Sequence, residues 1–223
     1  VLVTGGGDGF GSLEIIVDAV AQELTGKDAQ LVVICGRNEE LRRLLQARDW
    51  AQEAPGLSVV VRGFVSDMNL YMEASDVLLT KAGPGTIAEA AALGLPVLLT
   101  GFLPGQERGN VLWVREKNIG ELERSPEKAA RTVAAWLNDA EALETMSRNA
   151  RKAAKPQATD KIAEDLMALV EGVASFSVAR VLRDLKAPDA LSGALNYSRA
   201  VIGELKATLP FAPREAWRGL AAA

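Results

Sequence analysis

Five short apolar runs alternate with helical patterns along the first part of the chain, and this alternation constrains the fold more than any other feature. The runs are VLVT, LVVICG, LSVVVRGF, DVLLTKAG and LPVLLTG. They are continuously apolar rather than alternating, which is typical of strands buried on both faces of a sheet. Each is followed by glycine or polar residues and then by a helical pattern. The sequence therefore predicts an α/β fold, a doubly wound, Rossmann-like parallel sheet with helices on both faces.

The helical patterns between and after these runs have clear starts and stops. Apolar residues recur at helical spacing from residue 13 to residue 24, and Gly26 ends that pattern. Ser125 and Pro126 start a region that we expect to be helical to about residue 170, with a break at Pro156. Residues 173–223 carry only two weakly amphipathic stretches. Further helices are predicted over 38–52, 66–75, 86–94 and 109–117.

Composition excludes several classes of protein and of site. The net charge is −4, so the chain has no general attraction to nucleic acid, and we expect no nucleic-acid partner. No apolar run approaches the roughly 18 to 20 residues that span a bilayer. The chain has one cysteine, Cys35, and no histidine, so we expect no disulfide and no cysteine-based metal site. A general base must be a carboxylate or lie outside this chain. We expect a cytoplasmic protein.

Ligands of an open parallel sheet bind beyond the carboxyl ends of its strands, so the loops that follow the strands are candidate sites. GGGDGFGS follows the first strand and offers backbone N–H groups, including those of Gly7 and Gly9, to an anion. It does not match the dinucleotide fingerprint, because the sixth position is Phe10 counted from Gly5 and Ser12 counted from Gly7. Ser12 also stands where a P-loop needs lysine. A phosphate site and a simple tight turn both remain open.

The loop in KAGPGTIAEA is a second candidate anion site. Gly83 and Gly85 allow unusual dihedral angles and close approach of a ligand, and Pro84 stiffens the turn. Thr86 can cap the following helix or offer its hydroxyl in the first turn. Glu89 then either completes a capping box with Thr86 or accepts hydrogen bonds from a sugar diol. Local reasoning does not separate these two roles.

Two further loops carry weaker signals. GFLPGQERGN places Gln106, Glu107 and Asn110 just ahead of a helix, and amides with a carboxylate suit the recognition of several hydroxyls. On composition alone, a solvated loop explains the same residues. RGFVSDM places Phe64 and Val65 at the end of a strand, where backbone groups beside an apolar wall suit a flat base.

Taken in order, these segments resemble the C-terminal, donor-binding half of GT-B glycosyltransferases of family 28. The resemblance rests on GGGDGFGSL, VVICGRNEELRRLL and the long stretch from VRGFVSDM through GPGTIAEA to PGQERGN. It is strongest to monogalactosyldiacylglycerol synthases and related bacterial glycolipid synthases, with the peptidoglycan N-acetylglucosaminyltransferase more distant. It covers roughly residues 1–170 and implies a nucleotide-sugar-binding domain over 1–172, followed by a helical tail of unknown role over 173–223.

The resemblance also implies roles for individual residues. Gly7 and Gly9 would lie near the donor phosphates, and Arg37 and Arg108 are candidate partners for leaving-group charge by their chemistry. The resemblance assigns uracil to Phe64 and Val65, the pyrophosphate to Gly83, Gly85 and Thr86, the ribose to Glu89, and the sugar to Gln106, Glu107 and Asn110.

The implied activity is inverting transfer of a hexose, galactose or glucose, from a UDP-sugar to a lipid acceptor such as diacylglycerol. No cofactor and no obligatory metal are implied, and no metal ligands are expected. The catalytic residues are unknown, since the family's N-terminal domain supplies the base and the acceptor site and is expected to be absent here. A membrane surface is a further expected partner, which makes the protein peripheral. Two alternatives are a donor-binding subunit of a split glycosyltransferase and a UDP-N-acetylglucosamine 2-epimerase-like enzyme.

Overall fold

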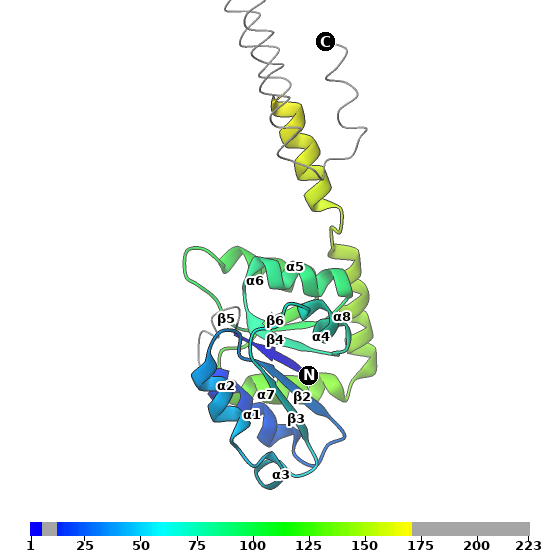
Figure 1. The fold of residues 1–223 in the computed structure, drawn as a ribbon. Helices are drawn as coiled ribbons and strands as arrows, with labels where there is room; N and C mark the ends of the chain where they lie inside the picture. The colour runs from blue at the N-terminus through cyan, green and yellow to red at the C-terminus, as the bar shows by residue number, and fades with distance from the viewer. Residues whose placement is uncertain (6–12, 171–223) are drawn as a thin grey trace, which may run out of the picture. The chain divides into compact units, whose positions relative to one another are not determined.

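The computed structural model describes residues 1–5 and 13–170. The chain divides into two compact units, Val1–Pro156 and Gln157–Ala223. The first unit is the α/β domain shown in Figure 1. In the second unit, residues 158–170 form a helix.

The α/β domain is built on six parallel strands in the order β3-β2-β1-β4-β5-β6. β2 and β3 lie on one side of β1, and the later strands β4, β5 and β6 lie on its other side. The order therefore reverses between β1 and β4, which is the switch point where ligands of such sheets bind. The strands are β1 (Leu2–Thr4), β2 (Gln30–Ile34), β3 (Ser58–Arg62), β4 (Leu78–Lys81), β5 (Val97–Gly101) and β6 (Gly120–Leu122).

The sixth strand is a correction to the five strands predicted from the sequence. β6 contains only the residues GEL, which carry no apolar run. It is a strand because it pairs with β5, and Gly120 lies opposite Val97. A Cβ atom added to Gly120 would lie 1.7 Å from the carbonyl oxygen of Val97, so this close approach requires glycine.

Helices cover both faces of the sheet, as the continuous apolar strands predict (Figure 1). One buried cluster joins the sheet to α1 and α7, and a second joins its other face to α4, α5 and α6. Val3 belongs to the first cluster and Leu2 to the second, so neighbouring residues of β1 are buried on opposite faces. The helices are α1 (Leu13–Leu24), α2 (Glu39–Gln46), α3 (Trp50–Glu53), α4 (Met68–Glu73), α5 (Pro84–Leu93), α6 (Arg108–Glu116), α7 (Pro126–Leu137) and α8 (Ala140–Ala153).

The single helix predicted over 38–52 is two helices in the structure. Asn38 caps α2 by accepting a hydrogen bond from the N–H of Leu41 at 3.0 Å. Asp49 then caps α3 by accepting one from the N–H of Gln52 at 3.3 Å. The second cap interrupts what looks like one periodic pattern, because aspartate is favoured at N-caps over helix interiors.

The helical region predicted from residue 125 to about residue 170 is confirmed, with two interruptions. α7 begins with Ser125 as its N-cap and Pro126 in the first turn. α8 ends at Ala153, and Pro156 lies in the turn that precedes the helix over 158–170. None of the helices in the described ranges is long and apolar enough to cross a membrane. The predicted boundary at 172 and the tail over 173–223 lie outside the described residues.

Candidate functional site

The candidate residues follow the five neighbouring strands β1 to β5, and parallel strands bring their carboxyl ends to one edge of the sheet. Arg37 and Phe64 follow β2 and β3, which pair with each other, whereas the loops after β4 and β5 lie on the other side of β1. We call these two groups the β2–β3 side and the β4–β5 side. Gly7 and Gly9, in the loop after β1, lie outside the described residues, so their role stays a prediction.

Helix α5 begins three residues earlier than a cap at Thr86 would allow. Gly83 is its N-cap, with φ −69° and ψ 129°, and Pro84 is in its first turn. Thr86 therefore lies inside the helix, and the capping box with Glu89 does not form. The expectation of unusual dihedral angles is also wrong, since neither Gly83 nor Gly85 has a positive φ.

The N-terminus of α5 is a candidate anion site. No side chain in the described ranges caps this helix. The first hydrogen bond within the helix is donated by the N–H of Ile87 to the carbonyl of Gly83, at 3.1 Å. A Cβ atom added to Gly85 would meet nothing within 4 Å. The N–H groups of the first turn carry the positive end of the helix dipole. This helix start can therefore receive an anion such as a phosphate group.

A β-bulge aligns Lys81 with the loop after β5. The register between β4 and β5 shifts after Thr80, which lies opposite Leu99, so that Lys81 lies opposite Gly101. Bulges locally re-aim a strand and its side chains. The Nζ atom of Lys81 lies 2.9 Å from Oε1 of Glu107 and forms an ion pair with it. The prediction gave Lys81 no role; its position at the end of a buried strand is the only sequence signal.

Glu107 is the one charged side chain among the described residues that is buried, with 6% of its surface exposed. Its other oxygen, Oε2, accepts a hydrogen bond from the N–H of Leu103 at 2.8 Å. Burial raises the pKa of this carboxyl, but the hydrogen bonds from Lys81 and Leu103 and the charge of Lys81 outweigh it and lower the pKa overall. The carboxylate thus stays charged while it holds its own loop in place.

Asn110 adds a second link between the loops of the β4–β5 side. Its Nδ2 atom donates a hydrogen bond to the carbonyl of Ala82 at 2.9 Å. The N–H of Ala82 in turn donates to the carbonyl of Gly101 at 2.8 Å. Since Ala82 and Gly83 precede α5 directly, these bonds fix the start of α5 against the loop that carries Gln106. Gln106 and Arg108 are exposed at the surface of that loop and of α6.

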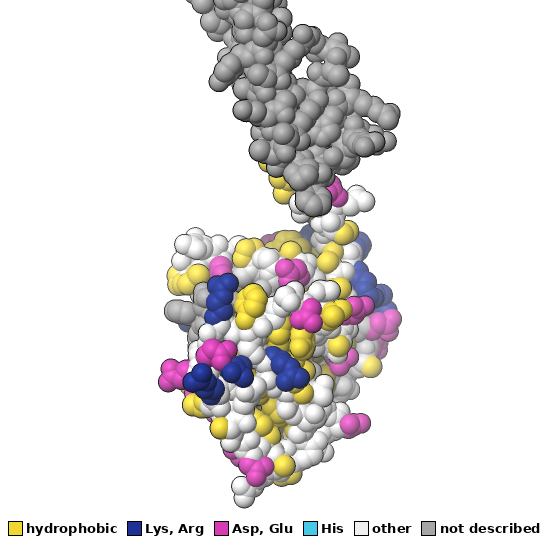
Figure 2. Space-filling model, viewed as in Figure 1, with side chains coloured by type: hydrophobic (Ala, Val, Ile, Leu, Met, Phe, Trp, Pro, Cys, Tyr) yellow, Lys and Arg dark blue, Asp and Glu magenta, His cyan; other side chains and the backbone are white. Residues whose placement is uncertain are grey.

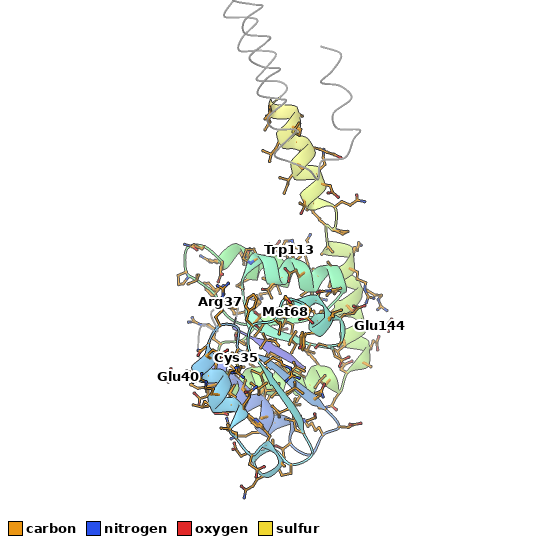
Figure 3. All side chains as sticks on the ribbon, viewed as in Figure 1. Cys35, Arg37, Glu40, Met68, Trp113 and Glu144 are labelled. Atoms are coloured by element: carbon orange, nitrogen blue, oxygen red, sulfur yellow. The ribbon has the colours of Figure 1, made fainter. Side chains whose placement is uncertain are left out.

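The β2–β3 side presents exposed groups. Arg37 lies with its guanidinium carbon 5.2 Å from the ring centre of Phe64, a cation–π contact. Phe64 has 60% of its surface exposed, whereas Val65 is half-buried against the second cluster. Cys35, which Figure 3 labels, follows β2 directly and is buried. Burial raises the pKa of the Cys35 thiol to about 11.

Charge around the domain is mixed. Figure 2 shows Lys and Arg side chains interspersed with Asp, Glu and hydrophobic side chains on the visible face. A cavity of about 420 Å³ lies at the opposite edge of the sheet, beside the amino end of β6, and contains none of the predicted residues. Its lining is Asn118, Gly120, Glu121, Trp136, Asp139, Glu141, Ala142, Thr145 and Met146.

An open parallel sheet whose strand order reverses beside the N-terminus of α5 defines a doubly wound, Rossmann-like α/β domain. Residues 1–162 match the model of the glycosyltransferase family 28 C-terminal domain. The chain belongs to this family, which confirms the resemblance seen in the sequence.

Two curated relatives are monogalactosyldiacylglycerol synthases. The chain is 43% identical to monogalactosyldiacylglycerol synthase 1 of Arabidopsis thaliana over 176 residues, which cover 76% of this chain and 32% of the relative. It is 44% identical to the monogalactosyldiacylglycerol synthase of Spinacia oleracea over 176 residues, or 76% of this chain and 33% of the relative. The chain therefore spans about a third of the length of these relatives.

Solved structures share the fold at lower identity. MurG of Acinetobacter baumannii aligns with a TM-score of 0.60 and 21% identity, over 73% of this chain and 48% of that chain. A putative UDP-N-acetylglucosamine 2-epimerase of Listeria monocytogenes aligns with a TM-score of 0.55 and 18% identity, over 77% of this chain and 45% of that chain. These likenesses confirm the predicted Rossmann-like fold.

Proposed function

We propose that this chain is the donor-binding half of an inverting glycosyltransferase. It binds a UDP-hexose, and the complete enzyme transfers the hexose to a lipid acceptor such as diacylglycerol. The observation that carries this proposal is the 43% identity, over 176 residues, to a synthase of monogalactosyldiacylglycerol. That product is one galactose joined to diacylglycerol, so UDP-galactose is the first donor to test, with UDP-glucose second.

In this proposal, each loop at the carboxyl edge of the sheet binds a different part of the donor. The open first turn of α5, at Gly83, Gly85 and Thr86, would hold the diphosphate. Phe64 and Val65 would flank the uracil from the β2–β3 side. Exposed Glu89, one turn into α5, would accept hydrogen bonds from the ribose. The loop before α6, with Gln106 at its surface, would face the hexose, and Glu107 and Asn110 beneath it would hold that loop in place.

In the proposed reaction an acceptor hydroxyl attacks the anomeric carbon while the bond to the diphosphate oxygen breaks. Negative charge accumulates on the departing UDP, and the N–H groups of α5 already point at the place where it forms. Arg37 and Arg108 are further candidates to offset this charge. The base that takes the proton, and the acceptor site, would lie outside this chain. We propose that the reaction needs no obligatory metal, and that the protein is cytoplasmic and peripheral at a membrane.

Calorimetric titration of the 223-residue chain with UDP, UDP-galactose, UDP-glucose, UDP-N-acetylglucosamine and NAD, with a chelator present, tests the proposal. We expect binding of UDP and of one UDP-hexose, and no binding of NAD. Gly85→Asp should abolish UDP binding, since it adds a negative charge in open space in the first turn of α5. Ala88→Asp is the matched control, because Ala88 is exposed on the same helix about one turn later.

Three results would contradict the proposal. One is the absence of binding to every uridine ligand. Another is equal UDP affinity in the Gly85→Asp variant and the unchanged chain. The third is turnover of UDP-N-acetylglucosamine without an acceptor, which would favour the epimerase alternative.

A further inference from the structure

The buried carboxylate of Glu107 is costly to the domain unless its charge is compensated. An ionised carboxylate removed from water is tolerated only when it is paired and hydrogen-bonded. Here one oxygen faces the ammonium group of Lys81 at 2.9 Å and the other accepts from the N–H of Leu103 at 2.8 Å. Both oxygens are therefore engaged before any ligand arrives.

Lys81 connects the two loops of the β4–β5 side. Its backbone ends β4, two residues before the N-cap of α5, and its side chain reaches the residue that precedes α6. A Cβ atom added to Gly83 would lie 3.4 Å from Nζ of Lys81, so the ammonium group lies close to the start of α5. The ion pair spans 26 residues of sequence. It therefore fixes the loop that carries Gln106 relative to the helix start.

We propose that Lys81 is a positioning residue for the hexose, acting through Glu107 without touching the donor. This inference rests on the proposed function of the site. Without Lys81, the carboxylate of Glu107 lacks a counter-charge and must move toward water, which displaces the neighbouring Gln106. The first turn of α5 keeps its own N–H groups. Loss of Lys81 should therefore weaken binding of the hexose and leave binding of the nucleotide diphosphate nearly unchanged.

The experiment compares UDP with UDP-galactose by calorimetry on the 223-residue chain. In Lys81→Met we expect affinity for UDP-galactose to fall about tenfold, within the usual range for coupled neighbours, and affinity for UDP to change less than about twofold. Lys81→Arg should keep both affinities, since it keeps the charge. Lys117→Met is the matched control, because Lys117 is exposed at the end of α6 and has no place in the site.

The double variant Lys81→Met with Glu107→Gln separates positioning from direct contact. It removes both charges and leaves an amide oxygen that can accept the N–H of Leu103, so it should fold and recover most of the affinity for UDP-galactose. A direct contact between Lys81 and the donor would not be recovered in this way. The UDP-galactose affinity of the double variant distinguishes positioning from direct contact even if Lys81→Met alone does not fold.

Equal losses for UDP and UDP-galactose in Lys81→Met, with no recovery in the double variant, would overturn the positioning role and make Lys81 a phosphate ligand. Absence of UDP and UDP-galactose binding by the unchanged chain would instead overturn the proposed function, and this inference with it.

Discussion

The two sides of the candidate site are built in different ways. On the β4–β5 side, polar groups bond to one another: Lys81 to Glu107, and Asn110 to the carbonyl of Ala82. On the β2–β3 side, Arg37 and Phe64 meet in a cation–π contact, with Phe64 largely exposed. Hydrogen bonds hold the groups of the β4–β5 side in place before a ligand binds, whereas the β2–β3 side presents exposed groups that a ligand can cover.

This difference predicts how changes on each side affect stability and ligand binding. Buried, hydrogen-bonded groups hold a geometry and contribute to stability, so changes on the β4–β5 side should alter both folding and binding. Exposed aromatic and guanidinium groups contribute little to folding and can stack on a flat ligand. Changes on the β2–β3 side should therefore alter binding much more than stability.

The largest expected effect is that of Lys81→Met on stability. It leaves the buried carboxylate of Glu107 unpaired, which costs about 3 to 5 kcal/mol when a pair is fully buried. The side chain of Lys81 is 37% exposed, so we expect about 2 kcal/mol at pH 7 after allowance for solvent screening. Urea unfolding measures this loss. Lys117→Met should change the free energy of unfolding by less than about 0.5 kcal/mol, as is usual for surface sites.

The next largest expected effect is the pH dependence of the stability that the Glu107 carboxylate contributes. Because the pKa of Glu107 is lowered in the folded chain, its ionised form adds stability above the unfolded pKa of about 4.3 and loses it as pH falls through the folded pKa. The free energies of unfolding of the unchanged chain and of Glu107→Gln should therefore differ most near pH 7. The difference should shrink as pH falls below about 4. A constant difference from pH 7 to pH 3 would show that the charge of Glu107 contributes nothing.

Asn110→Ala should have an intermediate effect. It removes one hydrogen bond to the carbonyl of buried Ala82, and we expect a loss of about 1 kcal/mol in urea unfolding. Asn149→Ala is a matched control, since Asn149 donates the same kind of bond to the carbonyl of Asn118 at 3.1 Å, away from the site. Only the change at Asn110 should also weaken UDP-galactose binding. Equal binding by both variants would remove Asn110 from the site.

The smallest effect on stability should be that of Phe64→Ala. Phe64 is 60% exposed, and an exposed cation–π contact is worth about 0.5 to 1 kcal/mol. UDP affinity should nevertheless fall, as titration would show, because a flat surface for the base is lost. Leu70→Ala is the control, since Leu70 is 55% exposed on α4. A loss of stability above 2 kcal/mol in Phe64→Ala would contradict the contrast between the two sides.

Local sequence signals predicted most of the fold. Continuous apolar runs located five strands, and helical spacing with Gly26 and Pro126 located the ends of helices. β6 was missed because GEL has no local strand signal and is defined by pairing with β5. The N-cap of α5 was misplaced because Thr86 is a good cap by type, whereas the proline at position 84 starts the helix earlier.

The sequence placed the candidate loops at the carboxyl ends of strands but did not predict the contacts between these loops. Because the strands are parallel, the loops that follow them lie at one edge of the sheet, which follows from the general rules for such sheets. The pair of Lys81 with Glu107 depends on a register shift after Thr80 and on a contact across 26 residues, which local patterns do not encode. The burial of Glu107 had no sequence signal either, since glutamate in a polar loop is normally solvated.

The short strand β6 also protects the sheet from joining another one. Strands at sheet edges expose unpaired N–H and C=O groups, which can recruit a strand from a second molecule. β6 has only three residues, and its middle residue, Glu121, is exposed. At the opposite edge, β3 ends in exposed Arg62. If sheets of several molecules joined edge to edge, both charges would be buried. The charges therefore oppose edge-to-edge aggregation, although the inner strands of the sheet are continuously apolar.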